Sequence, residues 1–158
     1  RDINKFSNNV MARQVFLTIG SDSAPATAER ARQRIADWLA GRNLRFAELV
    51  IDNGSGLSRS ERISADSLNR LLLDAWKSPV LPEFVASMPS VGIDGTMKKR
   101  LNGSDATGRA HIKTGTLDSV KTAAGFALDS QGRQHAVTFF VAGWFFAADC
   151  RIDAAACT

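Results

Sequence analysis

Two short polar motifs hold the residues of this chain that are best suited to chemistry. The first, Lys113, Thr114, Gly115 and Thr116, lies at the end of a strand predicted over Ala110–Thr114 and just before a hairpin. Side chains alternate between the faces of a strand, so Lys113 can offer its ammonium group to a carboxylate on one face. Gly115 has no side chain, which lets an extended peptide approach and pair with the strand edge. The motif indicates a site for an extended, carboxylate-bearing ligand.

The second motif, Ser7, Asn8 and Asn9, stands at the start of a helix predicted over about Asn8 to Ile19. Taken alone, it is explained by helix capping with Ser7 as the N-cap residue, because Ser and Asn are favoured there. The order of the two motifs is more specific. Serine penicillin-recognising enzymes carry a Ser-x-x-Lys, then a Ser-x-Asn, then a Lys-Thr-Gly. Ser7 with Asn9 matches the second of these motifs, and Lys113–Gly115 matches the third.

The sequence between the motifs resembles one family of these enzymes, the D-alanyl-D-alanine carboxypeptidase/endopeptidases of the penicillin-binding protein 4 type, peptidase family S13. The resemblance extends over about residues 5–142, and the tail, residues 143–158, is unassigned. We therefore interpret residues 1–158 as the C-terminal part of one transpeptidase-like domain. The resembling stretches are Phe6–Gly20, Asp52–Ser64, Ser87–Met97 and Lys113–Phe126.

The resemblance implies an α+β fold of the serine β-lactamase and penicillin-binding-protein type, with helices packed on an antiparallel sheet. The hydrophobic pattern agrees, because helical periods come first and strand signals with a Gly-containing turn come last. Besides the elements named above, we predict helices over about Ala26–Ala40, from Ser64 to Trp76 and over Glu83–Met88, and strands over Phe46–Ile51, Lys121–Leu128 and Gln134–Ala142.

The resemblance also implies roles for the motif residues. Ser7 would take part in the proton relay to the leaving amine, and Asn9 would hydrogen-bond the substrate amide or the lysine of the first motif. Lys113 would strengthen the positive field and, with Thr114, hold the terminal carboxylate. The backbone N–H of Thr116 would supply one oxyanion donor. The expected catalytic residues are Ser7, Asn9, Lys113 and Thr116, and the expected substrate-binding residues are Thr114 and Gly115.

The nucleophile of the family is missing from this sequence. The chain has six lysines, and none has a serine three residues before it. The resemblance implies that the Ser-x-x-Lys belongs to a preceding part of the protein. We therefore expect this chain alone neither to hydrolyse D-Ala-D-Ala nor to form a covalent adduct with penicillin.

The expected ligands are a peptidoglycan stem peptide or a β-lactam, and the resemblance places the protein in the periplasm. A missing N-terminal part of the same protein would pair with the sheet, and without it the exposed edge and face would lead to self-association. The net charge of +4 comes from scattered basic residues with no nucleic-acid module, and the longest apolar stretch is too short to span a membrane. No metal or organic cofactor is expected.

Several other polar residues have simpler explanations. His111 shares strand parity with Lys113 and could face the same cleft, although we favour a hydrogen-bonded strand histidine. His135 begins a strand and is expected to face solvent. Asp52, Ser55 and Asp94 lie in Gly-rich turns, and nothing places the two aspartates together. Cys150 and Cys157 could form a disulfide or stay free, since their spacing is not that of a zinc site.

Two other interpretations remain open. The absence of Ser-x-x-Lys favours a non-catalytic remnant that binds peptidoglycan or another protein, while the intact second and third motifs favour part of an enzyme. A β-lactamase relative shares the motifs, but the long spacing and the Asn-Gly-Ser-Gly-Leu-Ser-Arg sequence argue against it.

Overall fold

The structure is a computed structural model that describes residues 1–22, 25–142 and 148–151. The chain forms two compact units, and each is described by itself. The smaller unit is Asn8–Ser64, and the larger unit combines Arg1–Ser7 with Ala65–Thr158. Ser7, Lys113 and the residues that follow Lys113 therefore belong to one unit, and Asn9 belongs to the other.

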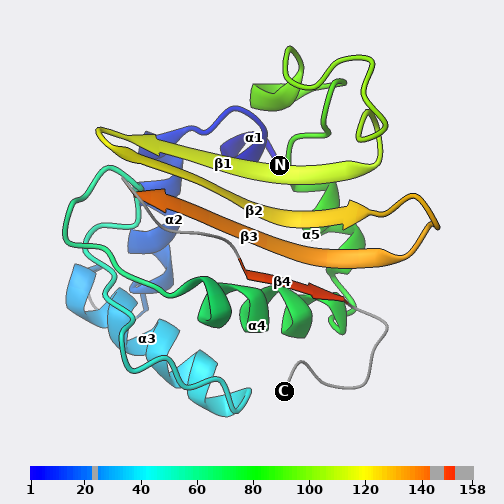
Figure 1. The fold of residues 1–158 in the computed structure, drawn as a ribbon. Helices are drawn as coiled ribbons and strands as arrows, with labels where there is room; N and C mark the ends of the chain where they lie inside the picture. Colours follow the sequence, from blue (N-terminus) through cyan, green and yellow to red (C-terminus); the bar gives the residue numbers. More distant parts are fainter. Residues whose placement is uncertain (23–24, 143–147, 152–158) are drawn as a thin grey trace. The chain divides into compact units, whose positions relative to one another are not determined.

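An antiparallel sheet is the central element of the larger unit. Among the described residues it has four strands in the order β1-β2-β3-β4, which places β1 at one edge (Figure 1). The turn between β2 and β3 contains Gly132, which has φ +78°, a conformation that favours glycine. The predicted hairpin is confirmed, and the bounds of β3 are those predicted. The strands are β1 (Ala110–Leu117), β2 (Val120–Leu128), β3 (Gln134–Ala142) and β4 (Ala148–Arg151).

Helices α4 and α5 cover one face of this sheet. Four buried side chains, Leu72, Met88, Phe126 and Ala136, form the core of this layer. The ring of Phe126 packs against Trp76 with centroids 5.3 Å apart. The sequence predicts α4 from its apolar stripe and from Pro79, which stops the helix because a proline interrupts the helical hydrogen bonds. The helices of this unit are α1 (Asp2–Lys5), α4 (Ala65–Trp76), α5 (Leu81–Ser87) and the short 3₁₀ helix η1 (Gly95–Met97).

A second core lies on the opposite face of β1. His111 pairs with Phe126 in the register and shares its face of the sheet. Ala110 and Ile112 alternate with His111, so their side chains point away from α4. They pack with Val91 and Met97 from the segment that precedes β1. The sheet is therefore buried on both faces at this end of β1.

The smaller unit contains α2 (Asn9–Ile19) and α3 (Ala28–Gly41). Thr27 caps α3, since its side chain accepts a hydrogen bond from the Arg30 backbone N–H. Gly20 ends α2 at a point where a Cβ would lie 2.7 Å from the Thr27 carbonyl oxygen, so the two helices approach closely only because this residue is glycine. Both helices were predicted to within two residues. The strand predicted over Phe46–Ile51 is wrong.

A turn and one isolated bridge replace that strand. The Leu49 N–H donates to the Phe46 carbonyl, and Val50 forms a single antiparallel bridge with Arg62. Val50 is exposed, and Arg32 of α3 donates to the carbonyls of Ile51 and Asp52. The sequence is apolar here, but its backbone groups bond within a turn, to the Arg62 backbone and to the Arg32 side chain, and no strand in the described part of the chain pairs with them.

Candidate active site

Lys113 and Ser7 are in contact across 106 residues of sequence. Lys113 Nζ donates a hydrogen bond to Ser7 Oγ at 2.9 Å and another to the backbone carbonyl of Thr114. Burial lowers the pKa of the Lys113 ammonium, because desolvation disfavours its charged form. An ammonium group has three donors, and these two contacts direct it toward the serine and the outer edge of β1.

Ser7 has a backbone conformation that is uncommon for a residue with a side chain. It lies between α1 and α2 with φ +53°. Such left-handed conformations cost about 1–3 kcal/mol and concentrate at functional sites. The prediction that Ser7 caps the helix is wrong, because Asn8 is the N-cap and its Oδ1 accepts the Met11 N–H at 2.9 Å. Because Asn8 takes this task, the Ser7 hydroxyl contacts Lys113 instead.

The edge of β1 carries backbone groups that point away from β2. The Ile112 N–H donates to the Pro89 carbonyl at 2.8 Å, so the backbone N–H and C=O groups of the even-numbered residues of β1 point to the outer edge. Thr114 and Thr116 continue this alternation along a strand that extends to Leu117, three residues beyond its predicted end. Their N–H and C=O groups therefore line the outer edge of β1, where Lys113 also donates to the Thr114 carbonyl.

Gly115 lies between these two threonines and pairs with Thr122 of β2. A Cβ at Gly115 would lie 2.4 Å from the Thr122 hydroxyl oxygen. A side chain at Gly115 would therefore displace the Thr122 hydroxyl, in addition to hindering the close approach of a ligand that the sequence suggests.

Asn9 is held by a loop of its own unit. Its Nδ2 donates to the Ser55 carbonyl at 2.5 Å. The loop is shaped by Asn53, whose Oδ1 accepts from both the backbone and the hydroxyl of Ser55, and by Glu61, which accepts the Gly54 N–H. This is the Asn-Gly-Ser-Gly sequence that the resemblance singled out, and its role here is to fix the Asn9 amide.

One of the two histidines, His135, differs from its expected surroundings. His135 is not solvent-facing as predicted: its side chain is 17% exposed and lies 3.2 Å from Asp129 Oδ2. Hydrogen bonds from Arg133 are the main reason that the pKa of Asp129 is well below its ordinary value. His111 is half-buried, and its Nδ1 has no hydrogen-bond partner among the described residues. Burial and then the charge of Lys5 lower the pKa of His111.

Asp94 pairs with a residue that the sequence analysis did not consider. Lys5 Nζ lies 2.5 Å from Asp94 Oδ2, and the Lys5 side chain is almost fully buried. Burial opposes ionisation of Asp94, but the hydrogen bonds from Lys5 and Ser90 outweigh it and lower the pKa of the carboxyl. No local signal marks Lys5, because its partner is 89 residues away and a lysine in a short helix is usually exposed. Asp52 belongs to the smaller unit, where its Oδ2 accepts a hydrogen bond from Asn53 Nδ2 at 3.1 Å.

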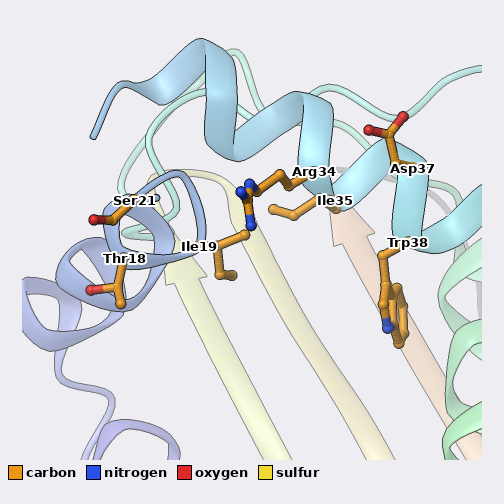
Figure 2. Close-up of a pocket in the computed structure, with 7 residues that line it drawn as sticks. All are labelled: Thr18, Ile19, Ser21, Arg34, Ile35, Asp37 and Trp38. Carbon is orange, nitrogen blue, oxygen red and sulfur yellow. The ribbon is translucent and has the colours of Figure 1, made fainter. Parts of the chain in front are cut away.

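The smaller unit has a surface pocket of about 660 Å³ between α2 and α3. Ile19 of α2 and Ile35 and Trp38 of α3 form its apolar lining (Figure 2). None of the predicted site residues lines it.

Within residues 1–22, 25–142 and 148–151, no group of three His, Cys, Asp or Glu side chains could hold a metal ion. No helix in the same ranges is both long enough and apolar enough to cross a bilayer. The question of a Cys150–Cys157 disulfide lies outside the side chains that the structure describes.

Known proteins are similar to this chain in sequence and in fold. Residues 1–156 match the D-Ala-D-Ala carboxypeptidase 3 (S13) family. A D-alanyl-D-alanine carboxypeptidase from Actinomadura sp. is 34% identical over 134 residues, which cover 81% of this chain and 25% of that protein. The D-alanyl-D-alanine carboxypeptidase DacB of Haemophilus influenzae is 26% identical over 144 residues, covering 89% of this chain and 30% of the relative.

A crystal structure of penicillin-binding protein 4 (DacB) from Haemophilus influenzae, complexed with a β-lactam, has a TM-score of 0.84 and 25% identity. The match covers 90% of this chain and 34% of that one. The chain belongs to the S13 family of D-Ala-D-Ala carboxypeptidases, and its fold is the α+β fold of penicillin-binding proteins. It spans about a quarter to a third of the length of the relatives it matches.

Proposed function

We propose that this chain supplies the second and third motifs of the active site of a serine D-Ala-D-Ala carboxypeptidase/endopeptidase that acts on peptidoglycan stem peptides and is acylated by penicillin. The hydrogen bond between Lys113 Nζ and Ser7 Oγ is the observation that supports it most. Two motifs far apart in the sequence meet there, beside a strand edge whose N–H groups can receive a peptide. Family membership supports a place outside the cytoplasm, and we propose the periplasm.

The proposed binding mode follows from the edge of β1. A stem peptide adds to β1 as an extended strand, and its terminal carboxylate interacts with the Lys113 ammonium and the Thr114 hydroxyl. Gly115 leaves room for the peptide backbone. The Thr116 N–H points to the same edge and donates to the carbonyl oxygen that becomes negatively charged during attack.

The proposed reaction needs a serine that this sequence does not contain. The seryl hydroxyl of a Ser-x-x-Lys elsewhere in the protein gives its proton to the lysine of that motif, its oxygen attacks the D-Ala-D-Ala carbonyl carbon, and the amide C–N bond breaks. Ser7 relays a proton to the departing amine, and Lys113 keeps the Ser7 hydroxyl oriented for the transfer. Asn9 hydrogen-bonds the substrate amide or the lysine of the Ser-x-x-Lys motif, and water then hydrolyses the acyl-enzyme.

A non-catalytic remnant is a second candidate. The specific observation that favours it is the absence of a Ser-x-x-Lys from all 158 residues. Such a protein would bind stem peptides at the β1 edge, or another protein, without turnover. The two candidates share the recognition residues and differ only in whether a nucleophile joins them.

Incubation of the chain with a fluorescent penicillin, followed by denaturing electrophoresis, tests the missing nucleophile. We expect no labelled band from this chain. A labelled band would show that a serine of this chain is acylated and would overturn the proposed division of the site.

Peptide binding tests the recognition site directly. We expect an acetylated peptide ending in D-Ala-D-Ala to shift the NMR signals of β1 and Ser7, and the same peptide ending in L-Ala-L-Ala to bind more weakly. Lys113→Ala should weaken binding about 10–100-fold, because a hydrogen bond to a charged group contributes about 1.5–3 kcal/mol. Lys99→Ala removes an exposed lysine and is the matched control. Equal binding by the Lys113 and Lys99 variants would refute the proposal.

A further inference from the structure

A buried lysine two residues before Ser7 has no role in the site as described so far. Lys5 ends α1 and is 5% exposed. Its ammonium lies 2.5 Å from Asp94 Oδ2, and Asp94 Oδ1 accepts the Ser90 N–H at 2.8 Å. A buried ammonium requires a charged partner, because an unpaired buried charge is strongly destabilising. The ion pair therefore joins α1 firmly to the segment that precedes β1.

The backbone of α1 is fixed as closely as the Lys5 side chain. A Cβ on Gly95 would lie 2.4 Å from the Lys5 carbonyl oxygen, and Gly95 has φ +55°. Asn4, the preceding residue, donates to Ser87 Oγ at 2.9 Å and so ties the same turn to α5. The chain just upstream of Ser7 is thus held by separate contacts with two other segments.

This fixation matters because Ser7 adopts a left-handed conformation, which persists only where neighbouring contacts determine it. The segment that holds Lys5 is also bridged to β1: Ser90 pairs with His111, two residues before Lys113. The ion pair therefore connects the chain beside Ser7 with the strand that carries Lys113.

We infer that Lys5, through its ion pair with Asp94, is a positioning residue that fixes the turn at Ser7 and keeps the Ser7 hydroxyl within hydrogen-bond distance of Lys113. The inference deepens the proposed function, and its effect on peptide binding rests on that function. The geometric part concerns only contacts within the larger unit.

His111 is consistent with this arrangement. It shares its face of β1 with Lys113, and Lys5 and Asp94 are the charged side chains that act on its ring. Burial and the Lys5 charge lower the pKa of His111, while Asp94 and the Met88 backbone oppose them. A neutral His111 adds no positive charge to that of Lys5 and Lys113. The ion pair of Lys5 with Asp94 is then unaffected by the imidazole.

The test uses NMR of the chain labelled at lysine Cε, with the variants Lys5→Met, Asp94→Asn and Lys5→Arg, and Lys99→Met as control. In the unaltered chain, Lys113 should show a lowered pKa and a nuclear Overhauser contact with Ser7. We expect Lys5→Met and Asp94→Asn to abolish this contact and to raise the pKa of Lys113 as its ammonium becomes solvated. Lys5→Arg should preserve both, and Lys99→Met should change neither.

Asp94→Asn separates positioning from a simple charge effect. Loss of a negative charge alone would lower the pKa of Lys113, whereas release of the Ser7 turn would raise it. A lowered or unchanged pKa with the Ser7 contact intact would overturn the inference. If Lys5→Met does not fold, the Asp94→Asn and Lys5→Arg variants still decide the question.

Peptide titrations then link the geometry to function. Lys5→Met and Asp94→Asn should bind the acetylated D-Ala-D-Ala peptide about tenfold more weakly than the unaltered chain, and Lys5→Arg should restore most of the affinity. If the unaltered chain fails to bind the peptide, the proposed function fails, and the positioning role is judged from the Lys113 pKa and the Ser7 contact alone. If the peptide binds and these variants bind it equally well, the positioning role fails and the proposed function stands.

Discussion

The side-chain amide of Asn9 donates to the backbone carbonyl of Ser55 at 2.5 Å, which makes the loop around Ser55 a support for the first turn of α2. The loop can approach α2 because Gly54 has no side chain: a Cβ there would lie 2.4 Å from Phe16 Cβ. Gly54 also has φ +68°, so a larger residue would be strained as well as crowded.

Gly54→Ala should therefore destabilise the smaller unit by about 2–5 kcal/mol, the sum of left-handed strain and overpacking. Gly56→Ala is the matched control, because Gly56 has φ +78° and a Cβ there meets only the Asn9 amide at 3.9 Å. We expect the control to cost about 1–2 kcal/mol from strain alone. Urea unfolding followed by far-ultraviolet circular dichroism measures both, and equal losses would contradict the proposed contact with Phe16.

A buried hydrogen bond connects α4 with β3 in the larger unit. Thr138 Oγ1 donates to Asn69 Oδ1 at 2.8 Å, and both side chains are buried. Thr138→Val should reduce the free energy of unfolding by about 1–3 kcal/mol, because the Asn69 amide loses a partner in a place that water does not reach. The double variant Asn69→Leu with Thr138→Val should lose less than the sum of the single variants in urea unfolding. Additive losses would indicate that the two groups do not interact.

The outer part of the sheet should make this chain self-associate. Phe139 and Val141 of β3 are 41% and 51% exposed, and β1 is an edge strand among the described residues. Exposed apolar side chains and an open strand edge each favour intermolecular association. We expect oligomers in size-exclusion chromatography with light scattering, and we expect Val141→Lys to shift the chain toward the monomer. A monomer at all concentrations would contradict this expectation, which also underlies the proposed pairing with another part of the same protein.

The elements with a repeating pattern could be predicted from the sequence. The apolar stripe followed by Pro79 was enough to predict α4, and the Gly-containing turn was enough to predict the bounds of β3. The strand predicted over Phe46–Ile51 was wrong, because an apolar run does not specify the hydrogen-bond partners of its backbone. Here Leu49 bonds to Phe46 in a turn, and Val50 forms a single bridge with Arg62. Local pattern thus determines an element where packing agrees with it, and fails where the hydrogen-bond partners are distant.

The site shows the same division. Lys113 could be selected from its motif, and the structure places its ammonium in contact with Ser7. The left-handed turn at Ser7 and the buried pair of Lys5 with Asp94 could not be predicted, because both depend on residues that come together only in the fold. Charged residues are usually exposed, so a sequence gives no reason to expect a buried lysine.

The lowered pKa of Lys113 makes two pH dependences testable. Burial favours the neutral amine in the folded chain, so between the lowered pKa and the ordinary value of 10.5 the unfolded chain binds more protons. The unfavourable effect of burying the ammonium is fully present below the lowered pKa and disappears as the pH rises through this window. The contribution of Lys113 to stability should therefore become less unfavourable with rising pH, whereas peptide affinity should fall, because the ammonium that holds the carboxylate is lost.

Isothermal titration of the D-Ala-D-Ala peptide across this range, beside urea unfolding at the same pH values, measures the two opposite trends. Lys113→Arg is the control, because a guanidinium keeps its charge throughout and should remove the pH dependence of both. An affinity that stays constant until the pH reaches 10.5, the ordinary lysine value, would show that Lys113 is solvated, contrary to its contacts with Ser7 and Thr114.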